Sequence, residues 1–140
     1  MLRLLTAGIF AAIATIATAA VATAAAPVPS AEAYRFELAG PVQSQDGTSI
    51  VPVRLIHLTD NKPVAGAIVI ESRADMGPIG MGEMTAPIKT LPVTTPGIYP
   101  FEVQNGAVWK KAGEWSLSFG AKVQGEAGTV RGSITVELKP

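Results

Sequence analysis

Residues 115–123 have the sequence WSLSFGAKV, in which large apolar side chains alternate with small or polar ones. A period of two is typical of a β-strand that buries one face, so Trp115, Leu117 and Phe119 are expected to point inward. Similar alternation recurs in four other stretches: YRFEL at 34–38, VPVRL at 51–55, YPFEV at 99–103 and VRGSITVEL at 130–138. A strand pattern therefore dominates the chain from Tyr34 onward.

Two less regular segments complete the expected set of strands. Residues 67–70, AIVI, are apolar on both faces, which predicts a central strand, and the proline-bounded residues 89–93 predict a weak edge strand. The chain of 140 residues holds 14 glycines and 11 prolines, too many for a helical bundle. Seven short strands in this length predict an all-β, immunoglobulin-like antiparallel β-sandwich, with a small β-barrel as the alternative.

The first 33 residues have the pattern of a secretory signal peptide. Arg3 is the only charge before Glu32, an uncharged apolar run continues to Val21, and small residues in A-x-A spacing occupy 22–24 and 31–33. We expect a signal helix over residues 1–24 with cleavage as late as residue 33, a flexible tether over 25–33, and the β-sandwich over 34–140. The alternative is an uncleaved anchor, because the apolar run is long enough to span a bilayer.

Export predicts a periplasmic or otherwise exported protein, with no membrane insertion once the signal is cleaved. The composition also excludes several classes of function. The 11 basic and 11 acidic residues give a net charge of zero, without the basic footprint of nucleic-acid binders. The absence of cysteine excludes disulfides and thiolate sites. His57 is the only histidine, and no G-x-S-x-G or Walker-type motif is present, so we expect no enzymatic activity.

Three of the four methionines fall within the stretch DMGPIGMGEM, residues 75–84. Thioether sulfur is a soft ligand that suits Cu(I), and the intervening glycines and proline favour a loop that could aim Met76, Met81 and Met84 at one point. His57 could add a nitrogen ligand. Alternatively, the methionines fill gaps in the packing or form a surface for a protein partner, and His57 is a surface residue. Trp109 could cap the methionine end or cover a sheet edge.

Residues 57–123 resemble the YtkA-like domain, which is related to the FixH family of bacterial envelope proteins. The resemblance rests on four motifs: DNKPVAGA at 60–67, the methionine segment at 76–84, PGIY at 96–99 and GEWSL at 113–117. It implies an exported immunoglobulin-like module, often associated with heavy-metal handling or with assembly of membrane metalloproteins. The methionine segment is the feature that would carry over. This chain departs from the family pattern in having Trp109, and no methionine, ahead of the Gly113-x-Trp115 element.

These observations predict an exported, non-enzymatic binding module that handles Cu(I) or another soft metal. The predicted metal ligands are Met76, Met81, Met84 and His57. The alternative is an accessory or assembly protein that docks on a membrane metal-efflux transporter or an oxidase component without binding metal itself.

Overall fold

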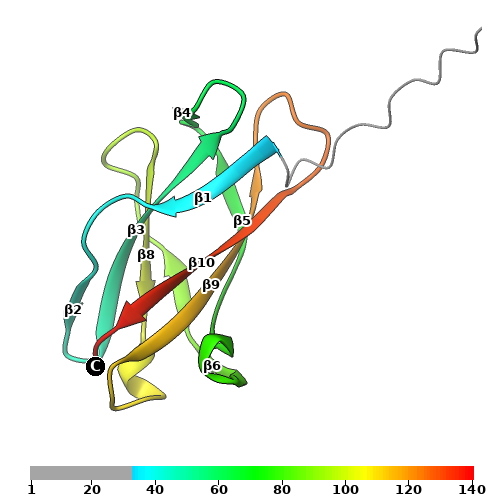
Figure 1. Ribbon diagram of the computed structural model, residues 1–140. Helices are drawn as coiled ribbons and strands as arrows, with labels where there is room; N and C mark the ends of the chain where they lie inside the picture. Colours follow the sequence, from blue (N-terminus) through cyan, green and yellow to red (C-terminus); the bar gives the residue numbers. More distant parts are fainter. Residues whose placement is uncertain (1–32) are drawn as a thin grey trace, which may run out of the picture.

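The computed structural model describes residues 33–140, which fold into two packed antiparallel sheets (Figure 1). The expected signal helix and nearly all of the expected tether lie outside the described residues. The first sheet has the order β1-β3-β8-β7, with β2 and β4 also paired to β3, and the second has the order β10-β9-β5-β6. The strands of the first sheet are β1 (Tyr34–Leu38), β2 (Gln43–Gln45), β3 (Thr48–His57), β4 (Lys62–Pro63), β7 (Ile88–Thr90) and β8 (Ile98–Val103). Those of the second sheet are β5 (Ile68–Met76), β6 (Met81–Ala86), β9 (Gly113–Lys122) and β10 (Val130–Leu138).

The predicted inward rows form the core between the sheets. Trp115 and Leu117 on β9 are completely buried, as are three residues of β3: Val51, Val53 and Leu55. Aromatic rings connect the two layers, because the Phe119 ring of the second sheet lies 5.2 Å from Phe36 and 4.5 Å from Phe101 of the first sheet. The prediction of a β-sandwich is therefore confirmed.

The predicted turn at Asp46-Gly47 closes the β2–β3 hairpin. Gln45 pairs with Thr48 across the turn, and both loop residues have positive φ, 52° at Asp46 and 80° at Gly47. This is the two-residue loop that the twist of an antiparallel hairpin favours. Gly47 also packs against the 3₁₀ turn η2 (Asn105–Ala107), where a Cβ on Gly106 would lie only 2.3 Å from the Gly47 Cα. Only glycine fits at Gly106, so this contact fixes η2 against the hairpin.

The prediction for residues 67–70 needs correction. β5 lies between β9 and β6, but the side chains of Ile68 and Ile70 are 66% and 49% exposed, so this segment is not buried on both faces. The reason is that the segment buries one face only: Val69 pairs with the buried Ala121 and packs against the core, whereas Ile68 pairs with the exposed Lys122 on the solvent face of the sheet. The predicted weak edge strand exists as β7, although it is shorter than expected and ends at Thr90.

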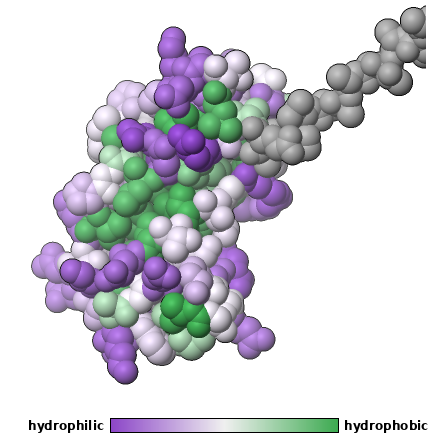
Figure 2. All heavy atoms as spheres, in the orientation of Figure 1, coloured by the Kyte–Doolittle hydropathy of each residue, from purple (hydrophilic) through white to green (hydrophobic). Residues whose placement is uncertain are grey.

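The surface contains apolar as well as polar areas. Figure 2 shows hydrophobic residues in a band across the middle of one face, with hydrophilic residues towards both ends. Apolar atoms cover much of any folded protein, so only exposed apolar side chains that lie close together call for an explanation.

Candidate functional site

The methionine segment is an ordered hairpin, where the sequence predicted a loop. β5 ends at Met76, the 3₁₀ turn η1 (Gly77–Ile79) follows, and β6 begins at Met81. The residues that break helices and strands lie mainly in the turn, where Pro78 is part of η1. Gly80 ends the turn with φ at 78° and donates its N–H to the Gly77 carbonyl at 2.9 Å. We call residues 76–84 the methionine hairpin.

The structure brings the three methionines together at one end of the sandwich. Met76 is completely buried and is the direct cross-strand partner of Met81. Met81 and Met84 are half-buried and pack against the same hydrophobic core. The hairpin therefore presents one enclosed thioether and two thioethers that are partly open to solvent.

Two tryptophans lie next to Met76. A Cβ on Gly113 would lie 3.2 Å from Met76 Cε and 3.4 Å from Trp109 Nε1, so Met76 and Trp109 both contact the space that Gly113 leaves free. Trp115 is the residue that faces Met76 when the β5–β9 register is continued one position beyond the pair Asp75–Ser116. The sequence named Gly113 only as part of the Gly113-x-Trp115 element; its close approach to Met76 was not predicted, although a glycine in a strand signals a close approach.

The carboxylate of Asp75 is occupied in holding the turn. Its Oδ1 accepts the Gly77 backbone N–H at 2.9 Å, and its Oδ2 accepts from Arg73 Nε at 3.0 Å. Arg73 also donates to the Gly82 carbonyl, which ties β5 to β6. Glu83 is exposed on β6. The hairpin therefore offers thioether sulfur as its principal ligand type, with the exposed Glu83 carboxylate on the same hairpin.

His57 lies at the opposite end of the sandwich. The hydroxyl of Ser49, at the start of β3, donates a hydrogen bond to the side-chain Oδ1 of Asn105. The backbone carbonyl of Asn105 accepts the backbone N–H of Trp109, so the start of β3 lies at the methionine end of the sandwich. His57 is at the other end of the same strand, about 26 Å away at ~3.3 Å per residue. It contacts Tyr34, with ring centroids 5.0 Å apart, and Asp60 at 3.1 Å. The structure therefore does not place His57 beside the methionines, because β3 is extended between them.

Oxygen and imidazole ligands do not gather elsewhere in residues 33–140. This part of the chain contains no group of three or more histidine, aspartate or glutamate side chains that could hold a metal ion. Near His57, Tyr34 donates its hydroxyl to Glu126 at 2.9 Å. Burial of Tyr34, followed by that hydrogen bond, raises the pKa of its hydroxyl above the usual value of 10. The hydrogen bond between Tyr34 and Glu126 therefore links β1 to the loop that precedes β10.

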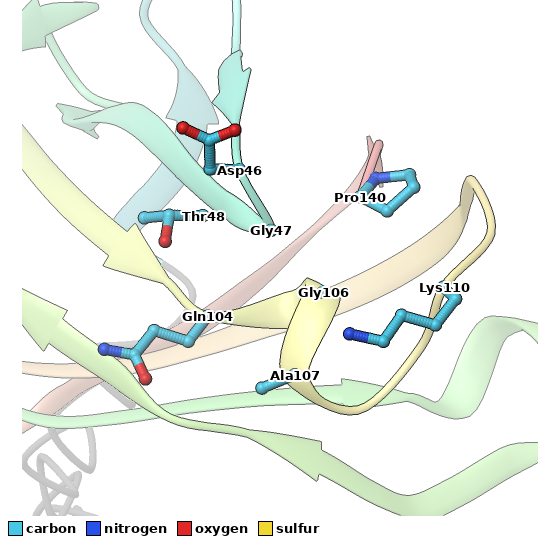
Figure 3. Close-up of a pocket in the computed structure, with 8 residues that line it drawn as sticks. All are labelled: Asp46, Gly47, Thr48, Gln104, Gly106, Ala107, Lys110 and Pro140. Atoms are coloured by element: carbon cyan, nitrogen blue, oxygen red, sulfur yellow. The ribbon is translucent and has the colours of Figure 1, made fainter.

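A shallow hollow lies at the same end of the sandwich as the methionines. Its lining includes Asp46, Thr48, Gln104, Lys110 and Pro140. In Figure 3 the Asp46 carboxylate points away from the Lys110 ammonium group, so the two charged side chains do not converge.

A protein-family model matches this chain. The model of the YtkA-like family matches residues 29–119, which is more than half of the chain. No curated protein and no solved structure matches it. Within residues 33–140, no helix has the length and apolar character needed to cross a membrane. The chain belongs to the YtkA-like family.

Proposed function

We propose that this protein is an exported, non-enzymatic binding module of the bacterial cell envelope that holds Cu(I), or another soft metal ion, at the methionine hairpin. One observation carries the proposal. Three thioether side chains from a single short hairpin pack at one end of the core, with Met76 enclosed and Met81 and Met84 partly accessible.

The chemistry of these ligands favours Cu(I) over other common ions. Thioether sulfur is soft and uncharged, whereas Zn²⁺ and Mg²⁺ prefer nitrogen and oxygen ligands. A thioether has no proton to release, so Cu(I) binding would not weaken through ligand protonation in acid. The exposed Glu83 carboxylate could offset the positive charge of the ion.

The geometry suggests an order in which the side chains act. Met81 and Met84 would meet the ion first, because both are partly exposed, and Met76 would complete the site from within. The indole ring of Trp109 borders the same space above Gly113 as Met76 does and could add a cation–π contact. His57 is left out of this ligand set because it lies at the far end of β3.

The test is competition for Cu(I) between the purified protein and a chromogenic Cu(I) chelator. We expect Met81→Leu and Met84→Leu each to weaken Cu(I) binding at least ~10-fold, which corresponds to ~1.4 kcal/mol. Both variants should stay folded, because leucine conserves the volume and apolar character of methionine. Methyl NMR of labelled methionines should show Met76, Met81 and Met84 shifting together when Cu(I) is added.

His57→Gln is the matched control. It removes the only imidazole, but at the other end of the sandwich, so Cu(I) affinity should not change. A wild-type protein that binds Cu(I) no better than the Met81→Leu/Met84→Leu double variant would overturn the proposal. The accessory-protein hypothesis, in which the module docks without metal, would then be preferred.

A further inference from the structure

A short irregular loop carries Trp109 to the methionine hairpin. It spans residues 108–112, between η2 and β9, and residues 110–112 are exposed. Trp109 itself is half-buried and packs against the hydrophobic core. Its backbone N–H donates to the Asn105 carbonyl at 2.9 Å, and the Val108 N–H donates to the same carbonyl at 3.1 Å. Asn105 therefore holds the start of the loop on which Trp109 lies.

The side chain of Asn105 is buried and fixed by hydrogen bonds at both of its polar atoms. Its Oδ1 accepts the Ser49 hydroxyl at 2.8 Å, and its Nδ2 donates to the Lys139 carbonyl at 3.0 Å. Ser49 is also completely buried, and its hydroxyl lies 2.9 Å from that of Ser44. Asn105 thus joins three parts of the fold that are distant in the chain: the start of β3, the turn η2 and the residue after β10.

The backbone next to Asn105 is fixed as well. The Gly106 N–H donates to the Gly47 carbonyl at 2.8 Å, and the close approach of these two glycines fixes η2 against the β2–β3 hairpin. In Figure 3, Gly47 and Gly106 border the same hollow as Pro140, the last residue of the chain. Asn105 is therefore anchored on every side except the one that leads to Trp109.

The ring of Trp109 reaches the enclosed thioether of the methionine hairpin. A Cβ on Gly113 would lie 3.4 Å from Trp109 Nε1 and 3.2 Å from Met76 Cε, so the ring and the thioether methyl are neighbours across this glycine. Met76 is the completely buried methionine of the three. Trp109 is therefore placed to cover an ion that the hairpin binds.

A buried polar network is a costly way to fasten a turn. Burial of an amide and a hydroxyl costs free energy that an apolar side chain would avoid, and only complete hydrogen bonding offsets it. Hydrogen bonds are directional, whereas apolar contacts are not, so a satisfied network specifies a single geometry. The segment whose geometry this network specifies is the loop that carries Trp109.

We propose that Asn105 is the positioning residue of the methionine hairpin: it holds Trp109 as a cover over the thioether site, and this cover slows the release of bound Cu(I). This inference rests on the proposed function. The indole ring keeps water from the ion on one side, and its π face attracts the positive charge. Asn105 is not itself a metal ligand, so its effect on release passes through Trp109.

The rate of Cu(I) release tests the proposal. Protein loaded with Cu(I) is mixed with a chromogenic Cu(I) chelator in such excess that the rate no longer depends on the chelator. We expect Trp109→Leu and Asn105→Ser each to release Cu(I) at least ~5-fold faster, in line with the loss of one cation–π contact. Ser49→Ala is a milder variant that removes the donor to Asn105 Oδ1, and it should also accelerate release.

A double-variant cycle separates positioning from a general loss of structure. In the Trp109→Leu background, Asn105→Ser and Ser49→Ala should add no further acceleration, because the ring on which they act is already gone. A merely structural effect would persist in that background. Indole N–H NMR gives a second readout, since the Trp109 resonance should move when Cu(I) is added to wild type but not to Met81→Leu/Met84→Leu.

Tyr99→Phe is the matched control. The Tyr99 hydroxyl donates to the Val64 carbonyl and accepts the Ala67 N–H, so this variant also removes side-chain hydrogen bonds from the edge of the core. These bonds lie beside β4, which pairs with Ile56 and His57 at the other end of the sandwich. The variant should lose stability and keep the wild-type release rate.

Two results would overturn the proposal while leaving the Cu(I) site in place. One is release at the wild-type rate from Ser49→Ala and from any Asn105→Ser protein that folds, and the other is an acceleration that persists in the Trp109→Leu background. Failure of the proposed function gives a different result, because wild type would then hold Cu(I) no better than Met81→Leu/Met84→Leu. That outcome would overturn both proposals.

Discussion

At the scale of single residues, Trp115 is the largest side chain that is completely buried. It lies beside Met76 and directly opposite Val136 on β10. Its buried indole N–H has no hydrogen-bond partner among the described residues. An unpaired buried donor costs ~1–3 kcal/mol, so the packing of the ring must exceed this penalty.

We expect Trp115→Ala to lower the free energy of unfolding by ~3–5 kcal/mol, because the substitution leaves a large cavity between the sheets. Since small domains have only ~5–15 kcal/mol in total, the variant should be poorly folded. Urea denaturation followed by circular dichroism measures the change. Trp109→Ala is the control and should cost less, because Trp109 is only half-buried. An unchanged unfolding midpoint for Trp115→Ala would contradict the burial of this ring.

At the scale of elements, a charged pair supports the attachment of β1 to β3. Glu37 lies directly opposite Arg54 across the two strands, and its carboxylate accepts hydrogen bonds from Arg54 and Arg35. The hydrogen bond from Arg54 lowers the pKa of Glu37 below its usual value of 4.5, although burial partly opposes the shift. The ionised carboxylate is therefore favoured in the folded state.

This shift predicts how the stability of the pair depends on pH. A lowered pKa in the folded state means that the stabilisation is fully present above pH ~4.5 and is lost as the pH falls through the folded pKa. We expect wild type to be more stable than Glu37→Gln above this pH range, and the difference in unfolding free energy to decrease as the pH falls through the range. It should be no more than ~1 kcal/mol, since the pair is partly exposed. A difference that stays constant across the window, or rises in acid, would show that Arg54 does not stabilise the carboxylate.

At the scale of the whole molecule, Ala33, which precedes β1, is tied to the rest of the fold. The Ala33 carbonyl accepts the Leu58 N–H at 2.9 Å, and Ala33 packs against the core. A chain cut after residue 33 would lose this bond and begin at the first residue of β1. A chain cut after residue 24 would keep it.

We therefore expect the exported protein to have an intact mass that corresponds to a first residue at Ala25, with the leader removed. Mass spectrometry of the protein recovered from the envelope measures this directly, and a chain that starts at Tyr34 serves as the comparison. The chain from Tyr34 should unfold at a lower urea concentration, because Leu58 loses its partner. A full-length mass in the membrane fraction would instead support an uncleaved anchor.

The sequence alone determined those features that depend on neighbouring residues. The alternation around Trp115 identifies its inward face because side chains in a strand alternate locally. Asp46-Gly47 identifies the hairpin because these residues accept positive φ. Met76, Met81 and Met84 could be predicted to lie together because they occupy one short segment.

Only the tertiary structure decided the features that depend on which strands become neighbours. The position of His57 follows from the length and direction of β3, which carries it away from the methionines. The burial of Met76 and the half-burial of Met81 follow from how η1 packs beside β9. The composition of residues 67–70 predicts a strand buried on both faces, but Ile68 and Ile70 are exposed, because Ile68 pairs with the exposed Lys122 on the solvent face of the sheet and a register shift follows at Val69. Local patterns specify the face of a strand, whereas its neighbours are set by contacts between residues distant in the chain.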